Sequence, residues 1–137
     1  MRTRTILVVD DENLVRWSLR QKLESAGYQV FEADTAAKAL TLFQECLPDL
    51  VTLDIRLPDA NGLKVLLDLK RQAPVVPIIM ITAYGAVDDA VKALQIGAYD
   101  FLEKPINFER LLHSIENALE TSVLRTEVER SKKEQAD

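Results

Sequence analysis

The 137-residue chain carries a formal net charge of -5 with a pI near 5.0, which disfavours direct binding to nucleic acid or to an anionic membrane surface. Hydrophobic residues make up 47% of the chain, enough for the core of a single domain. No apolar run is long enough to span a bilayer, no signal-peptide pattern is present, and the lone cysteine, Cys46, excludes an intrachain disulfide, so a cytoplasmic location is expected.

Short aliphatic runs alternate with stretches of helical periodicity about five times along the chain. Continuous runs of this kind are typical of strands that crossover helices bury on both faces. The predicted strands, in chain order, are Thr5 to Asp10, Gln29 to Glu32, Leu50 to Asp54, Pro77 to Thr82 and Tyr99 to Leu102. The predicted helices are Glu12 to Ala26, Thr35 to Cys46, Gly62 to Gln72, Ala86 to Ile96 and Phe108 to at least Ser122.

Residues at the ends of these segments suit their positions. Gly27 and Gly97 can take the left-handed conformation that closes a helix, whereas Thr35 and Asn107 can cap helix starts. Right-handed crossovers place the helices on both faces of a parallel sheet. The sequence therefore predicts an α/β fold: a doubly wound, flavodoxin-like sheet of five parallel strands in the order 2-1-3-4-5, with five helices.

Polar residues follow the predicted strands where each strand ends. In this strand order Asp10, Asp11 and Asp54 meet at the carboxyl ends of the first and third strands. Three converging carboxylates repel one another unless a cation neutralises them, and Mg2+ is favoured because it leaves coordination for a phosphoryl oxygen. Thr82 after the fourth strand and Lys104 after the fifth would complete a site for a multiply charged anion. The implied chemistry is phosphoryl transfer to a carboxylate.

These residues resemble, in type, order and spacing, those of the receiver domain of two-component response regulators. The resemblance covers roughly residues 5 to 121. It implies that Asp54 is the phosphoacceptor and that Asp11 binds Mg2+ directly, with Asp10 assisting through water. It also implies that the backbone carbonyl of Arg56 supplies another metal ligand.

The resemblance extends to residues that would respond to phosphorylation. It implies that Thr82 hydrogen-bonds the phosphoryl group, that Lys104 pairs with it, and that Phe101 is an aromatic switch. A cis bond is implied between Lys104 and Pro105, in keeping with the general restriction of cis peptides to X-Pro. Tyr84 falls at a position that, in the family, influences attack of water on the phosphoryl group.

Three segments are most like receivers at the front of nitrogen-regulator-type transcription activators, which depend on an alternative sigma factor and carry a central ATPase domain. They are residues 54 to 62, 81 to 85 and 97 to 105. The implied partners are a sensor histidine kinase, which supplies the phosphoryl group, and an output domain that is not part of this sequence. Neither His113, the only histidine, nor Trp17 is expected to take part in the chemistry.

The charged tail suggests a division of the chain. Residues 1–120 are expected to form the receiver domain, and residues 121–137 a helical extension toward the output domain. That extension and the region of the fourth and fifth helices could support a homodimer, or the extension could be a frayed, solvated terminus.

Single residues and the chain as a whole also allow other interpretations. Taken singly, Asp10 and Asp11 could cap the first helix, Thr82 could cap the fourth, and Phe101 could be a core residue. An aspartyl phosphohydrolase would carry a second Asp two residues after the first, where this chain has Arg56. A receiver that acts only in docking or dimerisation, without phosphorylation, would usually have lost an acidic or lysine position. This chain keeps all of the acidic positions and the lysine.

Overall fold

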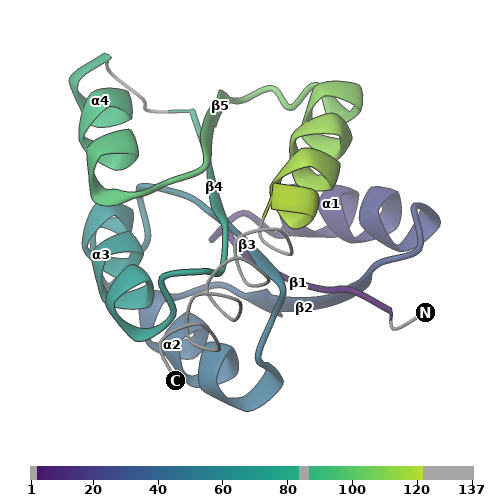
Figure 1. Cartoon of the computed structure of the whole chain (residues 1–137), viewed down its shortest axis with the longest axis horizontal. Helices are drawn as coiled ribbons and strands as arrows, with labels where there is room; N and C mark the ends of the chain where they lie inside the picture. Colours follow the sequence, from purple (N-terminus) through teal and green to yellow (C-terminus); the bar gives the residue numbers. More distant parts are fainter. Residues whose placement is uncertain (1–2, 84–86, 122–137) are drawn as a thin grey trace, which may run out of the picture.

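The computed structural model describes residues 3–83 and 87–121, which fold into five strands and five helices (Figure 1). The strands are β1 (Thr5–Val9), β2 (Gln29–Ala33), β3 (Leu50–Leu53), β4 (Ile78–Thr82) and β5 (Asp100–Glu103). The helices are α1 (Asn13–Ser25), α2 (Ala36–Cys46), α3 (Gly62–Gln72), α4 (Val87–Ile96) and a C-terminal helix whose described part is residues 108–121. Every predicted element is present, and the described boundaries differ from prediction by at most one residue.

The strands form one parallel sheet in the order β2-β1-β3-β4-β5, which confirms the predicted doubly wound fold. Figure 1 shows α2, α3 and α4 on one side of the sheet and α1 with the C-terminal helix on the other. All carboxyl ends of the strands therefore lie along one edge. From β1 the connection to β2 runs to one side of the sheet and the connection to β3 runs to the other, and in folds of this kind the ligand site lies at that switch point.

Two apolar clusters, one on each face, hold the layers together. Successive β1 residues alternate between them: Leu7 and Val9 belong to the cluster under α2, α3 and α4, and Ile6 and Val8 to the cluster under α1 and the C-terminal helix. All four are at most 1% exposed. Burial on both faces explains why the strand is a continuous aliphatic run with no polar alternation.

The predicted helix-end residues act as expected. Thr35 Oγ1 accepts the Lys38 N–H at 3.1 Å, and Asn107 Oδ1 accepts the Arg110 N–H at 3.1 Å. Gly27 has φ of 97° and Gly97 has φ of 128°, both in the left-handed region. No helix within the described ranges is both long and apolar enough to cross a membrane.

Candidate functional site

Four carboxylates lie together at the carboxyl ends of β1 and β3. One oxygen from each of Asp10, Asp11, Glu12 and Asp54 falls within 4.8 Å of the others. Asp10 and Asp54 are 2% and 3% exposed, whereas Asp11 and Glu12 lie at the surface. The acidic cluster, defined by these four residues, therefore has a buried floor and a solvent-exposed rim.

Lys104 reaches into the acidic cluster from the loop after β5. Its Nζ lies 2.8 Å from Asp10 Oδ2, 3.0 Å from Asp54 Oδ2 and 3.0 Å from Glu12 Oε1. The side chain is only 9% exposed. An ammonium has three N–H donors, and here each has a carboxylate acceptor, so the position of Lys104 is fixed by the acidic cluster.

Burial and hydrogen bonding shift the pKa values of Asp10 and Lys104. Burial raises the pKa of Asp10, and the hydrogen bonds from Lys104 and from the Glu12 N–H only partly oppose that rise. For Lys104, burial alone would lower the pKa, but the hydrogen bonds to Asp10, Asp54 and Glu12 outweigh it and raise the pKa above its usual value. Lys104 therefore stays protonated at physiological pH, and one ammonium cannot balance four carboxylates.

The oxygens of the acidic cluster are suitable ligands for a hard divalent cation. It offers four carboxylate groups, two of them on residues at the surface. Mg2+ prefers such oxygens and retains several waters, so the donor set of this site fits Mg2+ better than a metal that favours nitrogen or sulfur ligands.

Both carboxylate oxygens of Asp54 have partners. Oδ2 accepts from Lys104 Nζ, and Oδ1 accepts from the Arg56 N–H at 3.3 Å. The Asp54 N–H donates to the Val9 carbonyl at 3.1 Å, which ties the start of the loop to β1. The side chain that sequence analysis assigned as the phosphoacceptor is thus held in one orientation at the floor of the pocket.

The loop between β3 and α3 is closed on itself. Arg56 and Asn61 form an isolated antiparallel bridge, and the Leu57 N–H donates to the Ala60 carbonyl at 3.3 Å. Gly62 ends this loop, and a Cβ there would overlap the Asp54 carbonyl oxygen and lie 2.7 Å from Ile55 Cα. Only glycine allows this close approach.

The tip of the same loop contacts another helix. Asp59 Oδ1 accepts the Ala36 N–H at 2.8 Å, and Oδ2 accepts the Ala37 N–H at 3.0 Å, at the start of α2. These two hydrogen bonds lower the pKa of the Asp59 carboxyl. Sequence analysis did not identify this contact, because nothing local relates residues so far apart.

Arg16 secures the loop between β1 and α1. Its guanidinium donates to the Asp10 carbonyl at 2.6 Å and to the Asn13 side chain, and its Nε lies 3.4 Å from Glu32 Oε1. Asp10 Oδ1 also accepts the Glu12 N–H at 2.9 Å, so Asp10 caps the turn before α1 as well as contributing to the acidic cluster. The N-cap of α1 is Glu12, which makes no side-chain cap hydrogen bond, so Asp10 stabilises the turn before the helix, and its metal role stays a prediction.

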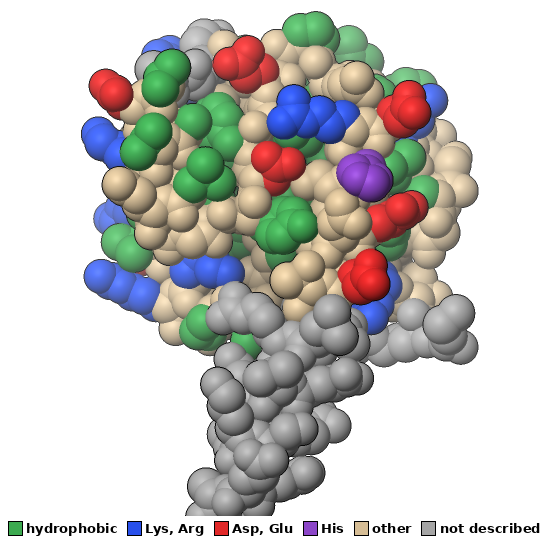
Figure 2. All heavy atoms as spheres, turned by 45° about the horizontal axis from the view of Figure 1, so that its top comes forward, with side chains coloured by type: hydrophobic (Ala, Val, Ile, Leu, Met, Phe, Trp, Pro, Cys, Tyr) green, Lys and Arg blue, Asp and Glu red, His purple; other side chains and the backbone are tan. Residues whose placement is uncertain are grey.

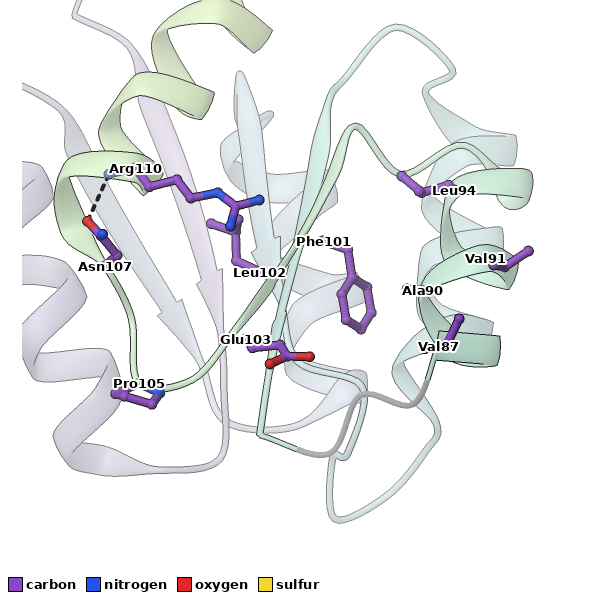
Figure 3. A pocket seen from close by; sticks show the side chains of 10 residues that line it. All are labelled: Val87, Ala90, Val91, Leu94, Phe101, Leu102, Glu103, Pro105, Asn107 and Arg110. Carbon is purple, nitrogen blue, oxygen red and sulfur yellow. Dashed lines mark hydrogen bonds between the residues drawn. The ribbon is translucent and has the colours of Figure 1, made fainter.

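Thr82 and Phe101 lie on the strands beyond β3. Thr82 ends β4, is fully buried, and its carbonyl accepts the Lys104 N–H at 3.0 Å. The Lys104-Pro105 peptide bond is cis. Figure 3 shows Phe101 pointing from β5 toward α4, across from Val87. Phe101 is half-buried, which leaves it in contact with the core yet beside a surface groove.

That groove, between α4 and β5, has a volume of about 500 Å³. Its apolar lining includes Val91 and Leu94, which are 47% and 51% exposed, and Val87, which is 80% exposed. In Figure 2 hydrophobic side chains (green) gather on the left of the view, on the side of the molecule that carries α4. An exposed apolar strip of this kind is typical of an interaction surface.

The other residues discussed in the sequence analysis are not part of the acidic cluster. His113 Nε2 lies 3.2 Å from Asn117 Nδ2 on the C-terminal helix and does not belong to the acidic cluster. Trp17 is 60% exposed on α1, which favours a partner surface over core packing. Tyr84 and the extension after residue 121 lie outside the described residues.

Sequence analysis missed Glu12 as a member of the site. Its signal was present, because Glu12 directly continues the acidic run of Asp10 and Asp11. Only the fold shows that the run curls toward β5, where Glu12 meets a lysine 92 positions later.

A family model, the response regulator receiver domain, matches residues 6–116. Among curated proteins, the alginate biosynthesis transcriptional regulatory protein AlgB of Pseudomonas syringae is 43% identical over 124 residues. The nitrogen assimilation regulatory protein NtrX of Azorhizobium caulinodans is 43% identical over 125 residues. Each alignment covers 90% of this chain but only 28% of the relative, so the chain spans little more than a quarter of their length.

Solved structures agree with these relatives. The NtrX structure from Brucella abortus in complex with ADP has a TM-score of 0.87 at 41% identity, covering 93% of this chain and 30% of that one. A CheY-like receiver domain protein from Methanospirillum hungatei JF-1 also has a TM-score of 0.87, at 32% identity, covering 90% of this chain and 99% of that one. With the fold, the acidic cluster and these matches in agreement, the chain belongs to the response regulator receiver domain family and is similar to the receivers of nitrogen-regulator-type transcription activators.

Proposed function

We propose that this domain accepts a phosphoryl group on Asp54 from a sensor histidine kinase, in the presence of Mg2+, and thereby controls a downstream output domain. One observation carries the proposal: Asp54 is buried at the floor of the acidic cluster and is hydrogen-bonded to Lys104 at 3.0 Å. A buried carboxylate oriented by a lysine beside a cation-binding cluster is arranged for attack on phosphorus.

Each residue has a distinct part in the proposed reaction. An Asp54 oxygen forms a bond to phosphorus as the bond from phosphorus to the donor nitrogen breaks, and the donor histidine leaves. Lys104 neutralises charge on the transferred oxygens, and the Thr82 hydroxyl donates a hydrogen bond to one of them. Asp10, Asp11, Asp54 and the Arg56 carbonyl would hold Mg2+, which supplies further neutralisation of charge when bound. The domain catalyses only its own phosphorylation and dephosphorylation.

The proposed switch couples Asp54 to the groove between α4 and β5. A phosphoryl group draws Thr82 inward, and the vacated space admits the ring of Phe101. Phe101 lines both the apolar core and the groove, so its movement alters the surface formed by α4 and β5. Phosphorylation then shifts a population between two packings of one surface.

A second groove offers a place for the kinase. It has a volume of about 520 Å³ and borders the acidic cluster through Glu12 and Lys104. Its apolar lining includes Leu14 of α1, which is 73% exposed, and Ile106 and Phe108 after β5. A partner helix seated there would bring a phosphohistidine to the rim of the pocket, as the proposed transfer requires.

We also propose a domain organisation, which the greater length of the relatives supports. Residues 1–120 would form the receiver and residues 121–137 a helical connection to the output domain. The relatives include transcriptional regulatory proteins about four times as long as the aligned segment. We infer a transcription-activating ATPase as the output and a cytoplasmic location for the whole protein, which fits the single cysteine.

The first experiment is the intact mass of the full chain after incubation with acetyl phosphate and Mg2+. We expect the gain of one phosphoryl group, lost in Asp54→Asn and in the presence of a chelator. His113→Gln is the matched control and should be phosphorylated as the wild type is.

Two outcomes would contradict the proposal. Phosphorylation of Asp54→Asn to the same extent would place the phosphoryl group on another residue. No phosphorylation of the wild type by acetyl phosphate or by a kinase would favour a receiver that acts only in docking.

A further inference from the structure

We propose that Asp59 is a positioning residue of the metal site, which holds the β3–α3 loop in the metal-binding conformation by anchoring its tip to the start of α2. The role deepens the Mg2+-dependent function proposed above and rests on it. Asp59 itself is not a ligand, since it does not belong to the acidic cluster.

The anchor is bidentate and joins distant parts of the chain. Asp59 Oδ1 and Oδ2 accept separate N–H groups, from Ala36 at 2.8 Å and Ala37 at 3.0 Å, across 23 and 22 residues of sequence. These N–H groups are among the first four of α2, which have no partner within the helix. Each carboxylate oxygen therefore meets a donor that the helix itself leaves unpaired.

The charge of Asp59 is also matched to its position. The first turn of α2 contains no acidic residue of its own, so the partial positive charge at its N-terminus is met by a carboxylate from another element. The hydrogen bonds from Ala36 and Ala37 are the leading cause of the lowered pKa of Asp59. The carboxylate is consequently ionised at neutral pH and binds the helix end in its stronger, charged form.

The other end of the anchor is rigid. Ala36 is 4% exposed and Ala39 is fully buried, and both belong to the apolar cluster that also contains Ile55. The start of α2 is thus fixed against the sheet. The loop, by contrast, has an exposed Arg56 and depends on a few backbone hydrogen bonds. Because the start of α2 is fixed and the β3–α3 loop is short and closed, the hydrogen bonds of Asp59 to α2 restrict the movement of the loop.

Arg56 lies three residues before Asp59 in this loop and is the residue whose carbonyl is proposed to bind Mg2+. Because the loop is closed by the bridge between Arg56 and Asn61, a change at its tip is passed to both residues. Ordering the loop before the metal arrives lowers the entropic cost of binding. Loss of the anchor should therefore weaken Mg2+ binding without removing a ligand.

The chain provides a matched control at the same helix end. Thr35 caps α2 through its own side chain, which accepts the Lys38 N–H at 3.1 Å, but among the described residues it makes no hydrogen bond to the β3–α3 loop. Thr35→Ala removes a cap from α2 and leaves the anchor in place. Asp59→Ala removes the anchor, and Asp59→Asn keeps an oxygen acceptor while removing the charge.

The test is an NMR titration of the full chain with MgCl2, following amide signals around the acidic cluster, together with amide hydrogen exchange. We expect Asp59→Ala to bind Mg2+ about fivefold more weakly, the scale of one lost helix cap. Thr35→Ala should bind as the wild type does, and Asp59→Asn, which keeps only one of the two acceptors, should recover at most part of the loss. Exchange of the Gly62 amide, which donates to the Ile55 carbonyl, should rise in Asp59→Ala but not in Thr35→Ala.

The outcomes separate this role from its alternatives. Equal Mg2+ affinity in Asp59→Ala and wild type would overturn the positioning role while leaving the proposed function standing. Equal weakening in Thr35→Ala would assign the effect to α2 stability and would overturn the anchor. No binding by the wild type would overturn both proposals.

Discussion

Asp10 and Lys104 show how one ion pair affects its two partners differently. The two side chains are 2.8 Å apart and both are largely buried. Burial outweighs pairing for Asp10, whose pKa is raised, whereas pairing outweighs burial for Lys104, whose pKa is also raised. The ionised form of Asp10 is thus disfavoured by the fold, and the ionised form of Lys104 is favoured.

We expect Asp10→Asn to stabilise the metal-free protein at pH 7. An acid whose pKa is raised on folding gives its full stability below the unfolded pKa, which is near 3.9, and loses it as pH rises through the folded pKa. Charged Asp10 is therefore unfavourable at neutral pH, and asparagine removes that penalty. Urea unfolding at pH 7 and pH 3.5 checks this, and the gain should shrink at the lower pH. A destabilised variant at pH 7 would contradict it.

Lys104→Met should have the opposite effect and destabilise the metal-free protein by about 3 kcal/mol, because Asp10 and Asp54 lose their cationic partner while staying buried. Added Mg2+ should restore part of the loss. Thermal unfolding with and without Mg2+ measures both effects. Lys70→Met, at a lysine outside the acidic cluster, is the control, and its stability should not respond to Mg2+ beyond the wild-type response. Unchanged stability of Lys104→Met without metal would contradict the argument.

At the scale of elements, the residue that follows α2 has a strained backbone. Leu47 follows α2 with φ of 46° and is 75% exposed. A left-handed conformation costs an L-residue roughly 1–2 kcal/mol, and glycine normally fills this position. Among the described residues, the other left-handed positions, Gly27 and Gly97, are glycines.

We expect Leu47→Gly to stabilise the domain by about 0.5–1 kcal/mol, since relief of backbone strain exceeds the added entropy of the unfolded chain. Gly27→Ala is the reciprocal control. A Cβ at Gly27 would meet no atom within 4 Å, so any loss of stability there comes from the backbone alone. Urea unfolding compares the two variants. A destabilised Leu47→Gly would show that its exposed side chain contributes more than its strain costs.

At the scale of the whole molecule, two apolar surfaces border the loop after β5, and Pro105 belongs to both. One includes Leu94 in the groove between α4 and β5, and the other includes Leu14 in the groove beside Lys104. Leu94 and Leu14 are 51% and 73% exposed. The first is the surface proposed for a homodimer, and the second is the surface proposed for the kinase.

We expect Leu94→Lys to prevent dimerisation of the phosphorylated chain, because each copy would bring an unpaired charge into an apolar contact. Leu14→Lys should leave that dimer intact. Analytical ultracentrifugation with beryllofluoride as the phosphoryl mimic measures this. Dimers of equal strength in Leu94→Lys and wild type would place the contact elsewhere.

The same pair of variants separates the kinase surface. Leu14→Lys should slow phosphoryl transfer from the kinase about tenfold while leaving phosphorylation by acetyl phosphate unchanged, since the small donor needs no docking surface. Leu94→Lys should accept phosphoryl groups from both donors at the wild-type rate. An equal loss with both donors in Leu14→Lys would assign its effect to the pocket itself.

The sequence alone determined the strands, their order and the edge at which the polar groups gather. Aliphatic runs such as Ile6 to Val9 are continuous because both faces of the sheet are covered, and crossover rules leave few ways to order five such strands. Once the order is known, Asp10 and Asp54 must lie together at the switch point. Local periodicity and topology were sufficient for this much.

Only the tertiary structure decided how that edge is held in place. Glu12 contacts Lys104, Asp59 caps α2, and Gly62 packs against the Asp54 backbone. A periodic sequence pattern predicts none of these contacts. These contacts join loops that are near in space but up to 92 residues apart in sequence. Their geometry depends on how the packed helices and strands place the loop ends, so it exists only once the two layers have packed on the sheet.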